Sequence, residues 1–91
     1  MEYRNEIKSF AEHMEIMLKT NEYKDGWRDF TDEYLLKRLF EHFEKLKERI
    51  LEGGSSILII QEAANVANYA MFIADNTGRK FNERIAKKLE K

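Results

Sequence analysis

Residues 57–74, ILIIQEAANVANYAMFIA, decide the fold of this chain. In a helix with about 100° per residue, four polar side chains and one tyrosine of this stretch lie in one sector, and the other sides are apolar. The five residues are Gln61, Glu62, Asn65, Asn68 and Tyr69. A helix that is apolar on its other sides belongs in a core, and each buried polar group without a partner costs about 1–3 kcal/mol. We therefore predict a core helix whose polar sector faces a ligand, water or the polar groups of a partner.

Periodic apolar residues predict three more helices. Apolar side chains recur every three or four residues over about residues 2–21 and 32–51, and every four residues over 81–89. The run at 57–60 would also suit a β-strand, but a strand without a partner run is not stable. The sequence therefore predicts an all-α fold, a small bundle with two long antiparallel helices, the buried core helix and a short fourth helix packed at one end.

The expected helix boundaries are N-cap residues and glycines. For the second helix they are Thr31 or Asp32 at the start and Gly53-Gly54 at the end. For the core helix they are Ser55 or Ser56 at the start and Gly78 at the end. Gly78 is thus expected to separate the core helix from the short fourth helix.

Length and composition narrow the functional class. Ninety-one residues make one domain, 1–91. Sixteen basic and seventeen acidic residues give a net charge of −1, which does not favour nucleic acid or an anionic membrane as a partner. The chain has no cysteine, which excludes a disulfide framework, a thiolate zinc site and a cysteine nucleophile. The first residues form no apolar signal core and polar residues interrupt the core helix, so we expect a cytoplasmic protein without a membrane span.

Self-association is expected from the size and apolarity of the chain. A chain this short buries only roughly 60–65% of the surface that its unfolded state exposes. A core helix this apolar in so small a domain favours a homodimer or homotetramer. A neighbouring subunit would then close a pocket between the polar sector and the second helix.

The second helix carries carboxylates that could meet the polar sector. Glu41, Glu44 and Glu48 are three and four residues apart, so they share a face. Carboxylates at this spacing repel one another unless they are solvated or bridged by a cation, and Mg²⁺ prefers oxygen ligands of this kind. Basic residues lie between them in the sequence, so an ordinary solvated face is the other interpretation of the same pattern.

The same residues resemble a known motif. Glu41-x-x-Glu44, then seventeen residues, then Glu62-x-x-Asn65 is similar to the signature of the MazG-type all-α nucleoside triphosphate pyrophosphohydrolases. That signature is Glu-Glu-x-x-Glu followed on the next helix by Glu-x-x-Asp. The wider resemblance is to a phage-type branch that includes dATP/dGTP diphosphohydrolase domains, and it covers about residues 8–90. It rests on residues 10–14, 21–27, 34–39 and 62–75.

The resemblance implies an activity, a metal and a site. The family hydrolyses nucleoside or deoxynucleoside triphosphates to the monophosphate and pyrophosphate with Mg²⁺, and Mn²⁺ is the expected substitute. The resemblance implies that the catalytic carboxylates Glu41, Glu44 and Glu62 hold the metal together with Asn65. It implies that the substrate is bound by Lys24, Trp27, Asn68 and Tyr69.

Two positions depart from the family motif. Phe40 stands where the motif has its first glutamate, and Asn65 stands where it has aspartate. An amide oxygen can still bind a metal, but the site loses one negative charge. The departures leave two alternatives: an enzyme with a weakened site, or a catalytically inactive nucleotide-binding or structural helical oligomer.

Several other residues suit either a functional or a structural role. Trp27 could stack on a base or seal the edge of the core, and Asn68 could form a hydrogen bond across a helix interface. His13 and His42 lack the spacing of metal ligands. Residues 79–91 carry six basic and two acidic residues, which could steer a triphosphate or simply be solvated.

Overall fold

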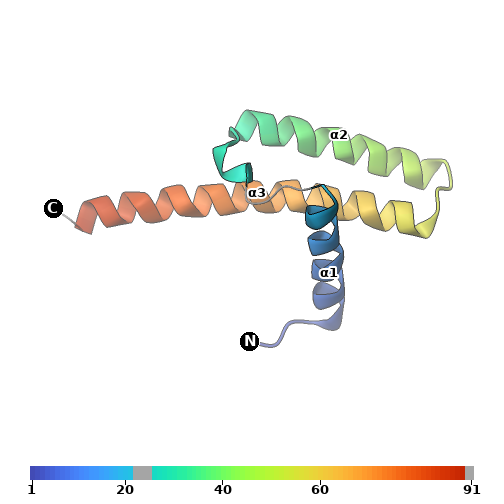
Figure 1. The fold of residues 1–91 in the computed structure, drawn as a ribbon, viewed down its shortest axis with the longest axis horizontal. Helices are drawn as coiled ribbons and strands as arrows, with labels where there is room; N and C mark the ends of the chain where they lie inside the picture. Colours follow the sequence, from blue (N-terminus) through green and yellow to red (C-terminus); the bar gives the residue numbers. More distant parts are fainter. Residues whose placement is uncertain (22–25, 90–91) are drawn as a thin grey trace.

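The computed structural model describes residues 1–21 and 26–89, and every element within these ranges is helical (Figure 1). The elements are α1 (Asn5–Thr20), the short 3₁₀ helix η1 (Gly26–Asp29), α2 (Asp32–Leu51) and α3 (Ser56–Leu89). The predicted all-α class is confirmed. The run at 57–60 lies in the first turns of α3 and is not a strand.

Side-chain caps begin α2 and α3 where the sequence predicted them. The Thr31 hydroxyl accepts a hydrogen bond from the backbone N–H of Tyr34, 3.1 Å away, at the start of α2. The Ser55 hydroxyl accepts from the N–H of Leu58 at 3.4 Å. Each bond satisfies one of the N–H groups that a first helical turn leaves without a partner.

Gly53 and Gly54 end a helix as predicted, whereas Gly78 does not. Gly53 adopts a left-handed conformation (φ 71°). The N–H groups of Gly53 and Gly54 then donate to the carbonyls of Ile50 and Arg49, which is the Schellman arrangement that ends a helix. Gly78 lies inside α3, so the predicted boundary there was wrong and the predicted third and fourth helices are one helix of 34 residues. A glycine costs a helix only about 1 kcal/mol relative to alanine, too little to end it when no turn or proline follows.

The arrangement of the helices differs from the predicted one. α2 and α3 are the antiparallel neighbours, joined by the turn at Gly53 (Figure 1). α1 crosses α3 instead of lying along it, and among the described residues α1 and α2 do not pack on each other. The C-terminal part of α3 projects past η1 and the start of α2 (Figure 1).

The core lies where α2, α3 and η1 meet. Its fully buried members are Leu35 on α2 and Tyr69 and Phe72 on α3. Half-buried apolar side chains pack around them: Leu18, Trp27, Leu39, Met71 and Ile73. α3 therefore supplies most of the core, as its sequence predicted.

The sequence predicted a buried core helix, and in the single chain one side of α3 remains exposed. The radius of gyration is 15.8 Å, whereas a compact domain of this length has roughly 12 Å. Phe81 is 60% exposed, and Ile57 and Ile85 are also exposed. By length and composition α3 could cross a membrane, a test that core helices of soluble proteins also pass.

Candidate functional site

The polar sector of α3 faces the other helices. Asn65, Asn68 and Tyr69 are buried, and only 14% of the Glu62 side chain is exposed. The sector divides between two interfaces, because its members contact both α1 and α2. The prediction that these side chains share one sector is confirmed, and polar groups of the same chain face them.

On the α2 side, Glu62 pairs with His42. The Nδ1 atom of His42 lies 2.9 Å from Oε2 of Glu62. Since a carboxylate only accepts, Nδ1 donates and the Nε2 atom of a neutral ring is left as an acceptor. His42 is 6% exposed, and its ring stacks on Tyr69 with centroids 5.3 Å apart and an angle of 21°. Nε2 is buried and has no hydrogen-bond partner among the described residues.

Sequence reasoning gave His42 no role, although one signal could have found it. Leu35 and Leu39 are buried or half-buried on α2, and His42 follows at the same helical phase. A histidine in an apolar stripe needs a partner when it is buried. Glu62 is an acidic residue on the neighbouring core helix, so it was the natural candidate.

A second contact between α2 and α3 involves Arg38. Its Nε donates to the Tyr69 hydroxyl at 3.4 Å, and its guanidinium also pairs with Glu41. The hydrogen bond to Tyr69, followed by the interactions with Glu41, raises the pKa of Arg38 above its ordinary value, against the opposing effect of burial. Glu41 is therefore paired with a cation of its own helix. Arg38 is a further residue that sequence reasoning did not single out.

On the α1 side, two asparagines join α3 to α1 and to the residue that follows it. The Asn68 side-chain amide donates to the carbonyl of Met14 at 3.0 Å. The Asn65 side-chain oxygen accepts from the side-chain amide of Asn21 at 3.4 Å. Both bonds link positions more than 40 residues apart, so they fix where α1 crosses α3.

Trp27 fastens η1 to α3. Its ring stacks on Phe72 with centroids 4.6 Å apart and an angle of 12°, and its Nε1–H donates to Asp75 at 3.0 Å. The carbonyl of Trp27 accepts from the Asn76 side chain at 3.0 Å. Arg79 pairs with both Asp75 and Asn76. The hydrogen bond from Trp27 and then the Arg79 charge lower the pKa of Asp75.

The predicted site residues are thus only partly brought together. Glu62, Asn65 and Tyr69 lie on one side of α3, while Glu41 and Glu44 are half-buried on α2. Within residues 1–21 and 26–89, no three histidine, aspartate or glutamate side chains lie close enough to hold a metal ion. Lys24 lies outside the described residues.

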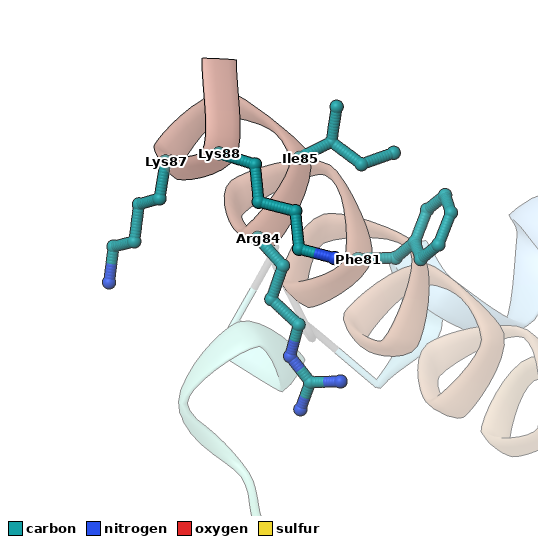
Figure 2. A pocket seen from close by; sticks show the side chains of 5 residues that line it. All are labelled: Phe81, Arg84, Ile85, Lys87 and Lys88. Carbon is teal, nitrogen blue, oxygen red and sulfur yellow. The ribbon is translucent and has the colours of Figure 1, made fainter. Parts of the chain in front are cut away.

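Two hollows formed by described residues lie along the C-terminal part of α3. One of about 370 Å³ is lined by Phe81, Arg84, Ile85, Lys87 and Lys88 (Figure 2). A smaller one of about 170 Å³ is lined by Arg28, Phe30, Asn76, Arg79, Lys80 and Glu83. Neither includes a predicted site residue.

Comparisons with protein-family models, curated proteins and solved structures find no match to this chain.

Proposed function

We propose that this protein is a Mg²⁺-dependent nucleoside triphosphate pyrophosphohydrolase of the MazG-like type. The observation that carries the proposal is that α2 and α3, which bear Glu41-x-x-Glu44 and Glu62-x-x-Asn65, are antiparallel neighbours with Glu62 at their interface. The substrates would be nucleoside or deoxynucleoside triphosphates, cleaved to the monophosphate and pyrophosphate.

The oxygen atoms of the proposed ligands are of the type that binds Mg²⁺. Carboxylate and amide oxygens are ligands that this hard cation prefers, and Glu41, Glu44, Glu62 and Asn65 offer such oxygens. Bound Mg²⁺, or Mn²⁺ in its place, would polarise the phosphate and the attacking water. Because the acidic side chains of residues 1–21 and 26–89 do not enclose an ion within one chain, the proposal requires that a second copy complete the site.

His42 has a defined part in this proposal. It holds one carboxylate oxygen of Glu62 and leaves the other available. A ligand whose second oxygen is fixed by a hydrogen bond keeps its orientation when a metal binds. Lys24, Trp27, Asn68 and Tyr69 remain the proposed substrate contacts. Because Asn68 and Tyr69 are buried in the single chain, substrate binding would have to open the interfaces that enclose them.

A homodimer or homotetramer is part of the same proposal. Its support is the large radius of gyration and the exposed apolar side chains on both long helices, such as Phe40, Phe43 and Phe81. A cytoplasmic location, with neither a membrane nor nucleic acid as a partner, remains a prediction from the sequence.

The second candidate is a catalytically inactive nucleotide-binding or structural oligomer. The observation that favours it is that Trp27 and Asn68 already have partners within the chain. Phe40, at the position of the first motif glutamate, is 60% exposed and cannot bind a cation through a carboxylate.

Pyrophosphate release separates the two candidates. Wild type, Glu62→Gln and Glu48→Gln are incubated with a panel of NTPs and dNTPs in the presence of Mg²⁺ or Mn²⁺. Glu62→Gln keeps an oxygen that can accept from His42, so the hydrogen bond between the two helices can be retained. Glu48→Gln is the matched control on the exposed side of α2. The enzyme predicts release that only Glu62→Gln abolishes. Wild type and both variants equally silent across the panel would contradict it.

Asn65→Asp tests the effect of the lost charge. The new carboxylate can still accept from Asn21, and it restores the charge that the motif has at this position. We expect tighter Mg²⁺ binding, measured as a larger rise in melting temperature on adding Mg²⁺. An unchanged Mg²⁺ effect would show that the missing charge is not what weakens the site.

A further inference from the structure

The smaller of the two hollows lies where η1 meets α3, and we call it the η1 hollow. Its volume is about 170 Å³, and it is lined by Arg28 of η1, by Phe30 directly after η1, and by four residues of α3: Asn76, Arg79, Lys80 and Glu83. The four α3 residues are three or four positions apart, so they lie on one side of the helix. The hollow is at the base of the part of α3 that projects past η1 (Figure 1).

We propose that the η1 hollow binds a phosphate group, either as a free phosphate or diphosphate ion or as part of a phosphorylated molecule. Asn76 lies about 21 Å along α3 from Glu62, so the hollow is separate from the carboxylates of the proposed metal site. The inference goes beyond the proposed activity and does not depend on it.

The first argument is the charge of the lining. Three of the six lining side chains are basic and one is acidic. Within residues 1–21 and 26–89, neither Arg28 nor Lys80 has an acidic partner at salt-bridge distance. Cations that converge on one hollow repel one another and attract an anion. Phosphate oxygens accept charge-assisted hydrogen bonds from both arginine and lysine.

The second argument is the fixed orientation of Arg79. Its guanidinium pairs with Asp75 and with the side-chain oxygen of Asn76, which is only 4% exposed. These two bonds use two of the five N–H groups of a guanidinium, and the Arg79 side chain remains 33% exposed. Arg79 therefore keeps donors for a ligand. A side chain that is already held in place loses less conformational entropy when the ligand binds.

Trp27 joins the two walls of the hollow. It directly precedes Arg28, its Nε1–H donates to Asp75 at 3.0 Å, and its carbonyl accepts from Asn76 at 3.0 Å. The pKa of Asp75 is lowered chiefly by the hydrogen bond from Trp27 and then by Arg79. A smaller effect on the same carboxyl comes from the charge of Arg28, so Arg28 lies near it. The basic residues of η1 and α3 are thus held close together before any ligand binds.

The size of the hollow and the charge of Glu83 limit the ligand. A volume of about 170 Å³ is below the roughly 300–1,000 Å³ of pockets for drug-sized ligands. The hollow therefore suits a small ion or the charged end of a larger molecule. Glu83 is an exposed carboxylate of the lining and repels an anion, so removing its charge must tighten binding.

Titration in EDTA tests the site, because without a divalent cation the proposed metal site does not hold a phosphate. Phosphate, pyrophosphate and dATP are added separately, with sodium chloride of equal ionic strength as the control. The readouts are the emission of Trp27, the only tryptophan of the chain, and the rise in melting temperature that binding to the folded state must cause. We expect saturable binding with a dissociation constant of about 1 mM or lower, tighter for pyrophosphate than for phosphate.

The order of affinities identifies the source of the phosphate group. Pyrophosphate binding more tightly than dATP assigns the hollow to a free ion, and the reverse order assigns it to the phosphates of a nucleotide. If none of the three ligands changes either readout beyond the chloride control, the proposal is overturned.

Four variants locate the binding site. Arg28→Gln and Lys80→Gln should each weaken binding by about five- to tenfold, whereas Glu83→Gln should tighten it several-fold. Lys47→Gln is the matched control, because it makes the same change of charge at an exposed position of α2 far from η1. Circular dichroism shows whether the helices are kept. An equal loss in Lys47→Gln, or binding that Glu83→Gln leaves unchanged, would overturn the site.

The result is independent of the proposed activity. Pyrophosphate release by a protein that binds none of the three ligands in EDTA would overturn the η1 hollow as a phosphate site and leave the activity standing. Binding in EDTA that follows the four variants as expected, without pyrophosphate release, would establish the site and contradict the enzyme.

Discussion

Asn68 provides a sharp test of the interface between α1 and α3. Its side chain is 0% exposed, and its amide donates to the carbonyl of Met14 at 3.0 Å. Two substitutions separate the contribution of the hydrogen bond from that of burial. Asn68→Ala removes the amide, and Asn68→Asp keeps its size but replaces the donor with a carboxylate.

The expected magnitudes differ. For Asn68→Ala we expect a loss of about 1–2 kcal/mol in the free energy of unfolding. One hydrogen bond contributes about 0.5–1.5 kcal/mol, and the Asn68 side-chain oxygen, which has no partner among the described residues, is removed with it. For Asn68→Asp we expect roughly 3–5 kcal/mol at pH 7, because an unpaired carboxylate would face a carbonyl in an enclosed position.

The pH dependence of Asn68→Asp follows from the same geometry. Burial without a cation raises the pKa of the new carboxyl above its unfolded value, so the protonated form is favoured in the folded state. A protonated carboxyl can donate to the carbonyl of Met14 as the amide does. The deficit relative to wild type must therefore shrink as the pH falls from 7 towards about 4.

Urea unfolding measures these differences. Trp27 is the only tryptophan of the chain and stacks on Phe72 of α3, so its emission reports whether η1 is packed on α3. Wild type and the two variants are unfolded at pH 7 and at pH 4.5. If Asn68→Asp lies within about 1 kcal/mol of wild type at pH 7, or if its deficit does not shrink in acid, the enclosed interface is wrong and Asn68 faces an open pocket.

Three further substitutions test the fold. Asp75→Asn should destabilise the protein at neutral pH. Trp27 and a nearby arginine lower the pKa of Asp75 in the folded state. The contribution of the Asp75 carboxylate to the free energy of unfolding is therefore present above its unfolded pKa and is lost as the pH falls through its folded pKa. A difference between wild type and variant that persists unchanged well below pH 4, measured by thermal unfolding, would contradict this. Thr31→Ala should cost about 1 kcal/mol in urea unfolding through the lost cap, and no loss would show that the cap does not stabilise α2. Leu35→Ala should cost about 2–5 kcal/mol, against less than about 0.5 kcal/mol for the exposed Leu36→Ala; equal losses would place the core elsewhere.

The features that could be predicted from the sequence are those set by residues close together in the chain. Thr31 and Gly53 mark the ends of α2 through caps that involve only the adjacent turn. The polar sector of α3 follows from the period of a helix alone. Gly78 was misjudged because its small helix penalty was treated as a boundary, although the residues around it continue the helix.

The contacts of the candidate site depend on pairing across the chain, which the pattern of one helix does not contain. His42 meets Glu62 only because the turn at Gly53 brings α2 back along α3 in one register. The pairing of Arg38 with Tyr69 follows from the same register. The acidic site residues were assigned from their positions in a motif. That motif contains no information on the ion pair between Glu41 and Arg38 of the same helix.

The crossing of α1 over α3 has a consequence for how the chain folds. The bonds between α2 and α3 join residues 20 and 31 positions apart, whereas those to α3 from Met14 and Asn21 span 54 and 44 positions. Longer loops cost more entropy to close, so the α2–α3 hairpin can form first and α1 docks onto it afterwards. Since α1 and α2 do not pack on each other, α1 can detach while the hairpin stays folded. We therefore expect the α2–α3 hairpin to unfold as one unit and subglobal opening to begin at α1.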